Sequence, residues 1–222
     1  MAEPTALDPK PPNTISLRAP SKYLADPSKP STTTLGDPFV GPPLKWLQRT
    51  WAVTHSTLRM WRSARNVRIT YQPYEKIAGA NDNLVEYEKR GSSGGAVKRV
   101  EGIEKPDPTI PSAWTWRGKG LLMIASSHWE VLGWGERPLL HGAGGVGDMG
   151  DGVERWAVTW FAPTLFTQEG VDIYSDRKEG LSKETVDGII KALKELKDAP
   201  KLVELVEKHM QEVEISLPWS EG

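Results

Sequence analysis

The chain has no cysteine, and its 222 residues contain no apolar run near the length of about 20 residues that spans a bilayer. The lack of cysteine excludes disulfides, thiolate nucleophiles and zinc–thiolate sites, and a reducing compartment is the simplest setting for such a chain. The first residues, "MAEPTALDPKPPN", lack the basic segment and apolar run of a secretion signal. We therefore expect a cytoplasmic protein with no membrane insertion.

Strong charge of either sign is also missing, because the formal net charge is -1. Nucleic acids and anionic membranes attract proteins with a concentrated positive field, so the sequence predicts no nucleic-acid partner. A P-loop, a G-x-S-x-G nucleophile motif and repeats of 20 to 50 residues are absent as well. Phosphate-loop NTPases, serine hydrolases of the elbow type and solenoids are thereby excluded.

One glycine-rich stretch, "HGAGGVGDMG" at residues 141–150, fits the G-x-G-x-x-G pattern of dinucleotide-binding proteins. That motif works only where a helix opens at its last glycine within a βαβ unit. The residues that follow, "ERWAVTWF", are typical of a strand instead. We interpret residues 135–154 as a long hairpin connection, and the sequence predicts no cofactor.

Two residue types stand out in this sequence, proline by its position and tryptophan by its number. Ten of the 18 prolines lie within residues 1–43, where they oppose both helix and sheet pairing and predict an extended N-terminal arm. The arm is either a disordered tail or a segment strapped over the domain by Leu17, Tyr23, Leu24 and Phe39. Ten tryptophans require a broad core or an aromatic cavity.

Residues 44–178 read as short β-prone runs separated by turn signals. Connections this short favour antiparallel hairpins, and closing eight strands removes both sheet edges while leaving room for one small ligand. The predicted fold class is mainly β, an eight-stranded up-and-down antiparallel barrel. The predicted strands are Thr50–His55, Val67–Gln72, Leu84–Lys89, Val97–Ile103, Leu121–Ala125, His128–Trp134, Arg155–Phe161 and Val171–Ser175.

Apolar residues recur at helical spacing only in residues 179–216. Ser182 is placed to cap a helix that carries Val186, Ile189 and Leu193 on one face. Pro200 suits the first turn of a second helix. Two amphipathic helices are therefore expected to pack on the barrel.

Several motifs in this order resemble the lipocalins of the calycin superfamily. They are Trp51, the second-strand pattern Asn66-Val67…Tyr71, the runs "VKRVEGIEKPDP", "SHWEVLGWG" and "ERWAVTWF", and the ending "VDIYSDRKEGLSKETVDGIIKALKEL". The resemblance covers about residues 46–196 and implies the closed barrel. It also implies structural roles for Trp51 and Arg177, with the arginine lying across the indole as a cation–π pair. Arg49 departs from the family pattern, which has glycine at this place.

In lipocalin topology the open end of the barrel carries the loops at residues 56–65 and 162–170. Met60 and Trp61 in the first loop and Phe166 in the second, together with Leu58 and Leu165, are apolar beyond what a solvated loop needs. They form either a lid over a bound hydrophobic molecule or a plug that fills the mouth. We count Met60, Trp61, Phe166 and Trp160 among the candidate ligand-binding residues.

Polar candidates complete the expected site. Strand alternation places His128 and Glu130 on one face, and the lipocalin resemblance favours His128 pointing inward with Ser126 beside it. His55 is expected on the lumen face of Trp51. If His55, His128 and Glu130 converge, they form an acid–base set for an enolisable substrate. Otherwise they orient a ligand by hydrogen bonds, or Glu130 faces solvent; their spacing does not favour a metal site.

Three function classes follow from these expectations. The preferred one is binding of a hydrophobic or aromatic small molecule inside the barrel. The alternative is a cyclase or isomerase of specialised metabolism that uses the same cavity. A filled barrel that serves only as an interaction module is the third.

Overall fold

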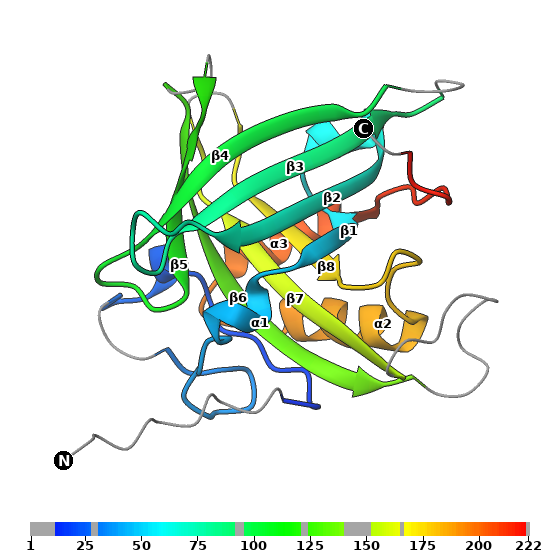
Figure 1. The fold of residues 1–222 in the computed structure, drawn as a ribbon. Helices are drawn as coiled ribbons and strands as arrows, with labels where there is room; N and C mark the ends of the chain where they lie inside the picture. Colours follow the sequence, from blue (N-terminus) through cyan, green and yellow to red (C-terminus); the bar gives the residue numbers. More distant parts are fainter. Residues whose placement is uncertain are drawn as a thin grey trace.

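The computed structural model describes residues 12–27, 31–91, 96–120, 124–139, 152–164 and 167–220. Eight antiparallel strands close into a barrel in sequence order, with β1 paired to both β2 and β8 (Figure 1). The strands are β1 (Thr50–Ser56), β2 (Ala64–Pro73), β3 (Asn81–Lys89), β4 (Lys98–Pro106), β5 (Ala113–Gly118), β6 (Ser126–Pro138), β7 (Val153–Phe161) and β8 (Gly170–Ser175). A two-residue strand, β9 (Gln211–Glu212), pairs with the end of β1.

The predicted eight-stranded up-and-down barrel is confirmed, but its fifth strand was predicted in the wrong place. The strand is Ala113–Gly118, whereas Ile124 of the predicted run Leu121–Ala125 lies in a turn with 90% of its surface exposed. Residues 121–123 lie outside the described part of the chain. The run at 121–125 is apolar but does not alternate. In "AWTWRG", Trp114 and Trp116 recur every second residue, as a strand with one lumen face requires.

Alternation along the strands builds the inside of the barrel. Trp51 on β1, Tyr71 on β2, Trp114 on β5 and Trp129 on β6 belong to one buried group, the lumen cluster. Near the start of β1, the short helix α1 (Leu44–Leu47) brings Trp46 against Trp51 and Trp134, with ring centroids 5.1 and 4.7 Å apart. This part of the interior is filled by aromatic rings.

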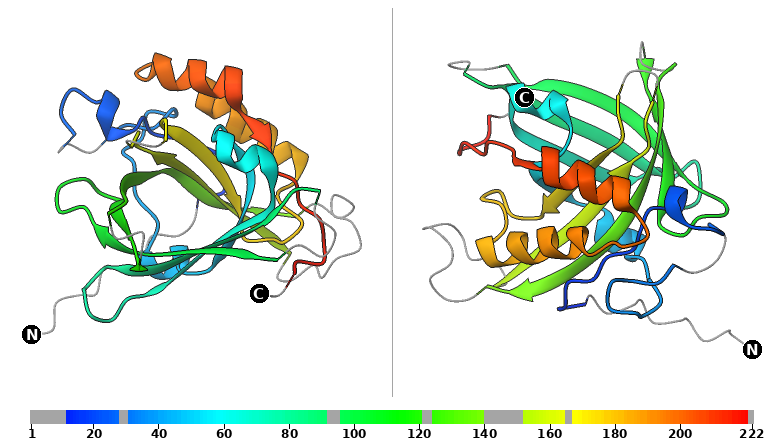
Figure 2. Two further views of the ribbon diagram at one scale, coloured as in Figure 1. Left: turned by 90° about the horizontal axis from the view of Figure 1, so that it is seen from above. Right: turned by 180° about the vertical axis from the view of Figure 1, so that it is seen from behind.

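The outside of β6, β7 and β8 is buried as well. The helices α2 (Lys183–Lys194) and α3 (Pro200–His209) lie against it (Figure 2), and Ile189, Leu193 and Leu202 pack on Trp156 and other outward side chains. We call this second apolar group the outer cluster. Ser182 caps α2 by accepting from the backbone N–H of Thr185, as its position before the apolar run predicts.

Residues 12–27 of the N-terminal arm cover the same side of the barrel as these helices (Figure 2), whereas in residues 31–43 Phe39 packs against the lumen cluster and the Val40 carbonyl accepts from Trp134 Nε1. Leu17 is fully buried in the outer cluster, and the Arg18 N–H donates to the carbonyl of Leu132 at 2.8 Å. Gly133 permits this approach, because a Cβ there would stand 2.2 Å from the Leu17 side chain. The 3-10 helix η1 (Ser21–Tyr23) follows, and the Tyr23 hydroxyl donates to Glu169.

The chain's last described residues, 213–220, return along the outside of β2. The Asn66 side chain bonds both the carbonyl and the N–H of Ser216, and Arg68 donates to the carbonyl of Ser220. None of the helices in the described ranges has both the length and the apolar character needed to cross a bilayer. The glycine-rich stretch at 141–150 lies outside the described residues.

Candidate functional site

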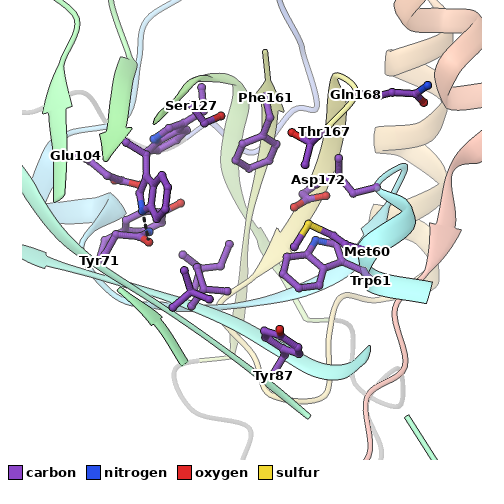
Figure 3. Close-up of a pocket in the computed structure, with 17 residues that line it drawn as sticks. Met60, Trp61, Tyr71, Tyr87, Glu104, Ser127, Phe161, Thr167, Gln168 and Asp172 are labelled. Carbon is purple, nitrogen blue, oxygen red and sulfur yellow. Dashed lines mark hydrogen bonds between the residues drawn. The ribbon is translucent and has the colours of Figure 1, made fainter. Parts of the chain in front are cut away.

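A cavity of about 200 Å³ occupies the part of the barrel interior away from α1. The 3-10 helix η2 (Arg59–Ser63), which connects β1 to β2, lines one side of it through Met60 and Trp61. Thr167 and Gln168, both solvent-exposed residues just before β8, line the same side, so the cavity is bordered by surface residues there (Figure 3). We call this space the lumen cavity.

The walls of the lumen cavity are mostly aromatic and aliphatic. The lining side chains that are not polar are Leu58, Met60, Trp61, Ile69, Tyr71, Val85, Tyr87, Val100, Trp116, Trp129 and Phe161. Gly102 on β4 shapes this wall, because a Cβ there would overlap the indole of Trp116, whose Nε1–H donates to Asn83 Oδ1 at 3.1 Å. Tyr71, Trp129 and Trp114 form a stack with centroid spacings of 5.5 and 4.6 Å.

Asp172 brings a carboxyl group into this aromatic wall. It lies on β8, between the outward residues Val171 and Ile173, and accepts a hydrogen bond from the Ser56 hydroxyl of β1 at 2.5 Å. Burial raises the pKa of Asp172 to about 7, and the Ser56 hydroxyl, the Trp61 indole and the charge of Arg62 only partly oppose this rise. Asp172 can therefore gain or lose a proton near neutral pH.

Glu104 on β4 is the second lumen carboxyl. It lies on the opposite side of the cavity from Asp172 (Figure 3) and is almost fully buried. Burial raises the pKa of Glu104 well above its usual range, although Asn81 and Trp129 face it closely enough to oppose the shift. Burial thus favours the protonated form of this carboxyl, which has one O–H donor in addition to acceptor oxygens.

Buried polar atoms around the cavity lack hydrogen-bond partners within the described residues. Glu104 Oε2, Trp129 Nε1 and Asn81 Nδ2 lie near one another without completing a hydrogen bond, and Trp61 Nε1 stands in the same relation to Asp172. Buried polar groups without partners cost free energy, so they are rare and need an explanation. Three of these atoms, Glu104 Oε2, Trp129 Nε1 and Trp61 Nε1, belong to residues that line the lumen cavity.

The electrostatic character of the lumen cavity is acidic. Among the described residues that line it there is no Lys, Arg or His, whereas two carboxyls are present. Arg62 acts on Asp172 through its charge, but its guanidinium is turned to the backbone carbonyls of Ser56 and His209, at 3.1 and 2.5 Å, and does not line the cavity.

Met60 and Trp61, predicted from the apolar loop after β1, do line the lumen cavity. Met60 is half exposed, while Trp61 is buried and packs edge-on to Tyr87 with ring centroids 5.5 Å apart. Leu58 lines the cavity too, and its side chain occupies the space over Gly170. Phe166 and Leu165, predicted from the second loop, lie outside the described residues.

The expectation that His128 faces the lumen, with Glu130 beside it, is wrong. Alternation along β6 is as predicted, but Ser127 and Trp129 line the cavity, and His128 and Glu130 face outward. Glu130 is fully buried beneath the N-terminal arm, where Arg18 reaches it at 3.0 Å and the Ser21 N–H and hydroxyl donate to it. His128 contacts Glu130 at 3.2 Å.

The contacts of Glu130 indicate a structural role for this outward-facing carboxylate. Burial alone would raise the pKa of Glu130, but the hydrogen bond from His128 and the charge of Arg18 hold it below its ordinary value. Separating a buried carboxylate from its cation is costly, because each charge is then left buried without its partner. Glu130 fastens the arm to β6, because Arg18 and Ser21 belong to the arm.

His55 is also misplaced by the prediction. The β1–β8 register shifts between Val53 and His55, so His55 lies opposite Ile173 of the outer cluster and Ser56 lies opposite Asp172. This irregularity reverses the alternation that places Trp51 and Val53 inside. Burial lowers the pKa of His55, which Glu212 and Asp187 partly oppose. The three residues His55, His128 and Glu130 therefore do not line the cavity.

Ser126 and Trp160 are likewise outside the lumen lining. Ser126 is exposed at the start of β6, and it is the next residue, Ser127, that borders the cavity. Trp160 packs in the outer cluster and donates from Nε1 to Glu169 at 3.3 Å. No three His, Asp or Glu side chains of the described ranges are grouped so as to hold a metal ion.

The cation beside Trp51 is a different arginine from the one expected. Arg49 lies over the rings of Trp46 and Trp51, at 5.2 and 5.4 Å from their centroids, whereas Arg177 reaches Glu179 at 3.5 Å. The correction has a local reason, because Arg49 is the residue at which the sequence departs from the lipocalin pattern. Its guanidinium also donates to the carbonyl of Trp46, which ties α1 to β1.

Glu104 and Asp172 were missed at the sequence level. In "VEGIEK", Val100, Gly102 and Glu104 share one face, and in "VDIYS", Asp172 and Tyr174 share another, so the period-two signal was present. The usual rule turns Asp outward and Val or Ile inward. It fails on β8 because the helices bury the outer face and Val171 and Ile173 pack there.

A search of the chain against protein-family models finds no matching model, and a search against curated proteins finds no match. The closed eight-stranded antiparallel barrel is thus the part of the lipocalin resemblance that the structure supports.

Proposed function

We propose that this barrel binds a small, largely aromatic or apolar molecule in the lumen cavity, in the manner of a lipocalin-like carrier. The observation that carries the proposal is a cavity of about 200 Å³ whose mostly aromatic and aliphatic wall includes buried polar atoms without a completed hydrogen bond, namely Glu104 Oε2, Trp61 Nε1 and Trp129 Nε1. Binding sites for small molecules combine an apolar lining with a few polar groups that fix orientation.

The size of the cavity limits the ligand. A buried apolar cavity of about 150 Å³ accepts benzene, and sites for drug-sized molecules have about 300–1,000 Å³. A cavity of about 200 Å³ suits a single ring with a short substituent. Met60, which is half exposed and lines both this cavity and a neighbouring one of about 220 Å³, is a side chain that can move to admit a larger molecule.

Two adjacent serines give a matched test of the binding site. Ser127→Trp adds a large side chain to the cavity wall, whereas Ser126→Trp adds the same side chain at an exposed position outside it. Binding of toluene and 2-phenylethanol is measured by isothermal titration calorimetry, and by quenching of the tryptophans that line the cavity. We expect Ser127→Trp to lose binding of both compounds and Ser126→Trp to retain it.

The proposal fails if the unmodified protein binds none of a panel of one-ring compounds, charged ones included. Equal binding by both variants would also contradict it, because the ligand would then lie elsewhere. Circular dichroism of each variant separates loss of the site from loss of the fold.

A second function, proton transfer in a cyclase or isomerase, has one specific observation in its favour. The group concerned is Asp172, whose pKa burial raises to about 7 and which borders an aromatic cavity. General bases work best with a pKa near the working pH. In this second proposal the acid–base groups are Asp172 and Glu104, in place of His55, His128 and Glu130.

The proton-transfer function is tested with 5-nitrobenzisoxazole, a flat two-ring probe. The Asp172 carboxylate would take the proton from the ring carbon; the released electron pair forms the nitrile, the N–O bond breaks, and the phenolate of 2-cyano-4-nitrophenol leaves. We expect the rate to rise as the pH passes about 7 and to fall at least about tenfold in Asp172→Asn. A rate equal to that of acetate in solution, or one unchanged in Asp172→Asn, would restrict the lumen to binding.

A further inference from the structure

Resting on the proposed binding function, we infer that the ligand of the lumen cavity is a lipophilic amine, bound with its ammonium group against Asp172 and its apolar body among the aromatic rings. The charge of the cavity carries this inference. Its described lining has two carboxyls and no basic side chain, so an anionic group placed there would meet only acidic or neutral neighbours. Like charges in a site of low dielectric repel strongly, and opposite charges attract.

The surroundings of Asp172 suit an ammonium ion in particular. Trp61 lies next to the carboxyl, and Phe161 and Tyr87 are further rings of the same cavity (Figure 3). Aromatic faces attract cations, and rings placed around a site are a recurring way of holding ammonium groups. Asp172 supplies the full negative charge that such rings lack, while the Ser56 hydroxyl already fixes the carboxyl through one of its oxygens.

The nearest competing cation does not block this pairing. The Arg62 guanidinium donates to the carbonyls of Ser56 and His209, and it acts on Asp172 through its charge without forming an ion pair with it among the described residues. Asp172 differs in this way from Glu130 of the outer face, which Arg18 contacts at 3.0 Å. The lumen carboxyl is therefore buried without a direct ion pair among the described residues, and a cationic ligand would supply one.

Glu104 contributes differently. Its carboxyl lines the cavity and has no hydrogen-bond partner for Oε2 among the described residues, so it can hydrogen-bond a hydroxyl at the other end of the ligand, and burial favours its protonated form. The spacing of the two groups on opposite sides of the cavity favours a molecule with its amine at one end and an uncharged polar group at the other (Figure 3).

Three probes of one shape separate the charge of the ligand from its fit. Phenethylamine, 2-phenylethanol and phenylacetate share a ring and a two-carbon chain or its carboxylate equivalent, and are cationic, neutral and anionic at pH 7.5. By calorimetry on the full chain, we expect phenethylamine to bind at least about tenfold more tightly than 2-phenylethanol, and phenylacetate more weakly than both. Asp172→Asn should remove the tenfold preference for phenethylamine over 2-phenylethanol.

Asp82→Asn is the matched control, because Asp82 is a partly exposed aspartate on β3 that pairs with Lys119 outside the cavity. It should leave all three affinities unchanged. If 2-phenylethanol binds as well as phenethylamine, the amine inference is overturned and the proposed binding function stands. If none of the three binds, the proposed function itself fails.

The pH profile adds an independent readout. Phenethylamine affinity should rise about tenfold per pH unit up to about pH 7 and then level off until the amine, with a pKa near about 10, loses its proton. The groups that face Asp172 are Ser56, Trp61, Arg62, Thr159, Tyr71 and Tyr174, none of which changes charge between pH 5 and 8. Glu104 is a further carboxyl of the same cavity, so the pH profile of phenethylamine affinity is measured again in Glu104→Gln. A rise that persists there and disappears in Asp172→Asn assigns the titration; a flat profile contradicts the pairing.

Discussion

Buried acids on the two faces of this barrel are treated in opposite ways. On the outside, Glu88, Glu130 and Glu154 are each almost fully buried and each accept hydrogen bonds from a separate segment: the C-terminal tail, the N-terminal arm and the start of α2. Inside, Glu104 has no hydrogen-bond partner for Oε2 among the described residues, and no basic side chain pairs with Asp172 there.

The pKa values follow the same division. Hydrogen bonds and arginine charge outweigh burial at Glu130, and hydrogen bonds from Asn66, Ser220 and Arg65 do so at Glu88, so both values lie below the ordinary one. At Glu104 and Asp172, burial outweighs the neighbours and both values are raised. The outer acids thus attach peripheral segments to the barrel, whereas the inner acids form no ion pair among the described residues.

The largest effect is expected when the arm's attachment is broken. Glu130→Ala leaves Arg18 buried without its partner, and breaking a buried pair costs about 3–5 kcal/mol. We expect the free energy of unfolding, measured by urea denaturation, to fall by that amount, and the arm to become sensitive to protease. A loss below about 1 kcal/mol would mean that the pair does not hold the arm.

The next largest effect is expected in the pH dependence of the free energy of unfolding, which should differ in sign between Asp172 inside the barrel and Glu130 outside it. A folded-state pKa of about 7 for Asp172, above its unfolded value near about 4, means that the folded protein binds the extra proton. Stability from this group is therefore greatest at low pH and falls by up to about 1.4 kcal/mol per pH unit between about pH 4 and 7. Asp172→Asn should remove that fall, as measured by denaturation at pH 5, 6, 7 and 8.

Glu130 provides the contrast, since its pKa is lowered. Its stabilisation is present above the unfolded pKa of about 4.5 and is lost as the pH falls. Glu130→Gln should therefore flatten the stability curve on the acid side, where Asp172→Asn has no such effect. Parallel curves for the two variants would contradict the assignment of opposite shifts.

A smaller effect is expected at the start of α2. Ser182 caps the helix and donates from its hydroxyl to Glu154 at 2.7 Å. Ser182→Ala removes both contacts, and N-cap replacements cost about 1 kcal/mol. Denaturation measures the loss, and Ser182→Thr, which keeps the hydroxyl, should recover most of it.

The smallest effect is expected from His128, which faces outward beside Glu130. His128→Gln should leave the affinity for 2-phenylethanol within about twofold, whereas Ser127→Trp one position earlier abolishes it. Calorimetry decides this point. A tenfold loss in His128→Gln would return His128 to the binding site and remove the distinction between the faces.

Much of the architecture was predictable because local patterns carry it. Seven of the eight predicted strands overlap observed ones, and the cap at Ser182 and the first-turn Pro200 mark the starts of α2 and α3. The one strand that was misplaced is the fifth, where the apolar run 121–125 does not alternate. Met60 and Trp61 were found because large apolar side chains in a loop are informative by themselves.

The sequence by itself determined the period of each segment, the order of the strands and the positions of the helices, since these depend on neighbouring residues. Only the tertiary structure decided which face of β6, β7 and β8 is the inside. The arm and the helices bury the outer face, so both faces are apolar and alternation cannot distinguish them. The register shift in β1 then turns His55 away from the lumen, and two carboxyls that local rules assign to solvent, Glu104 and Asp172, become its acids.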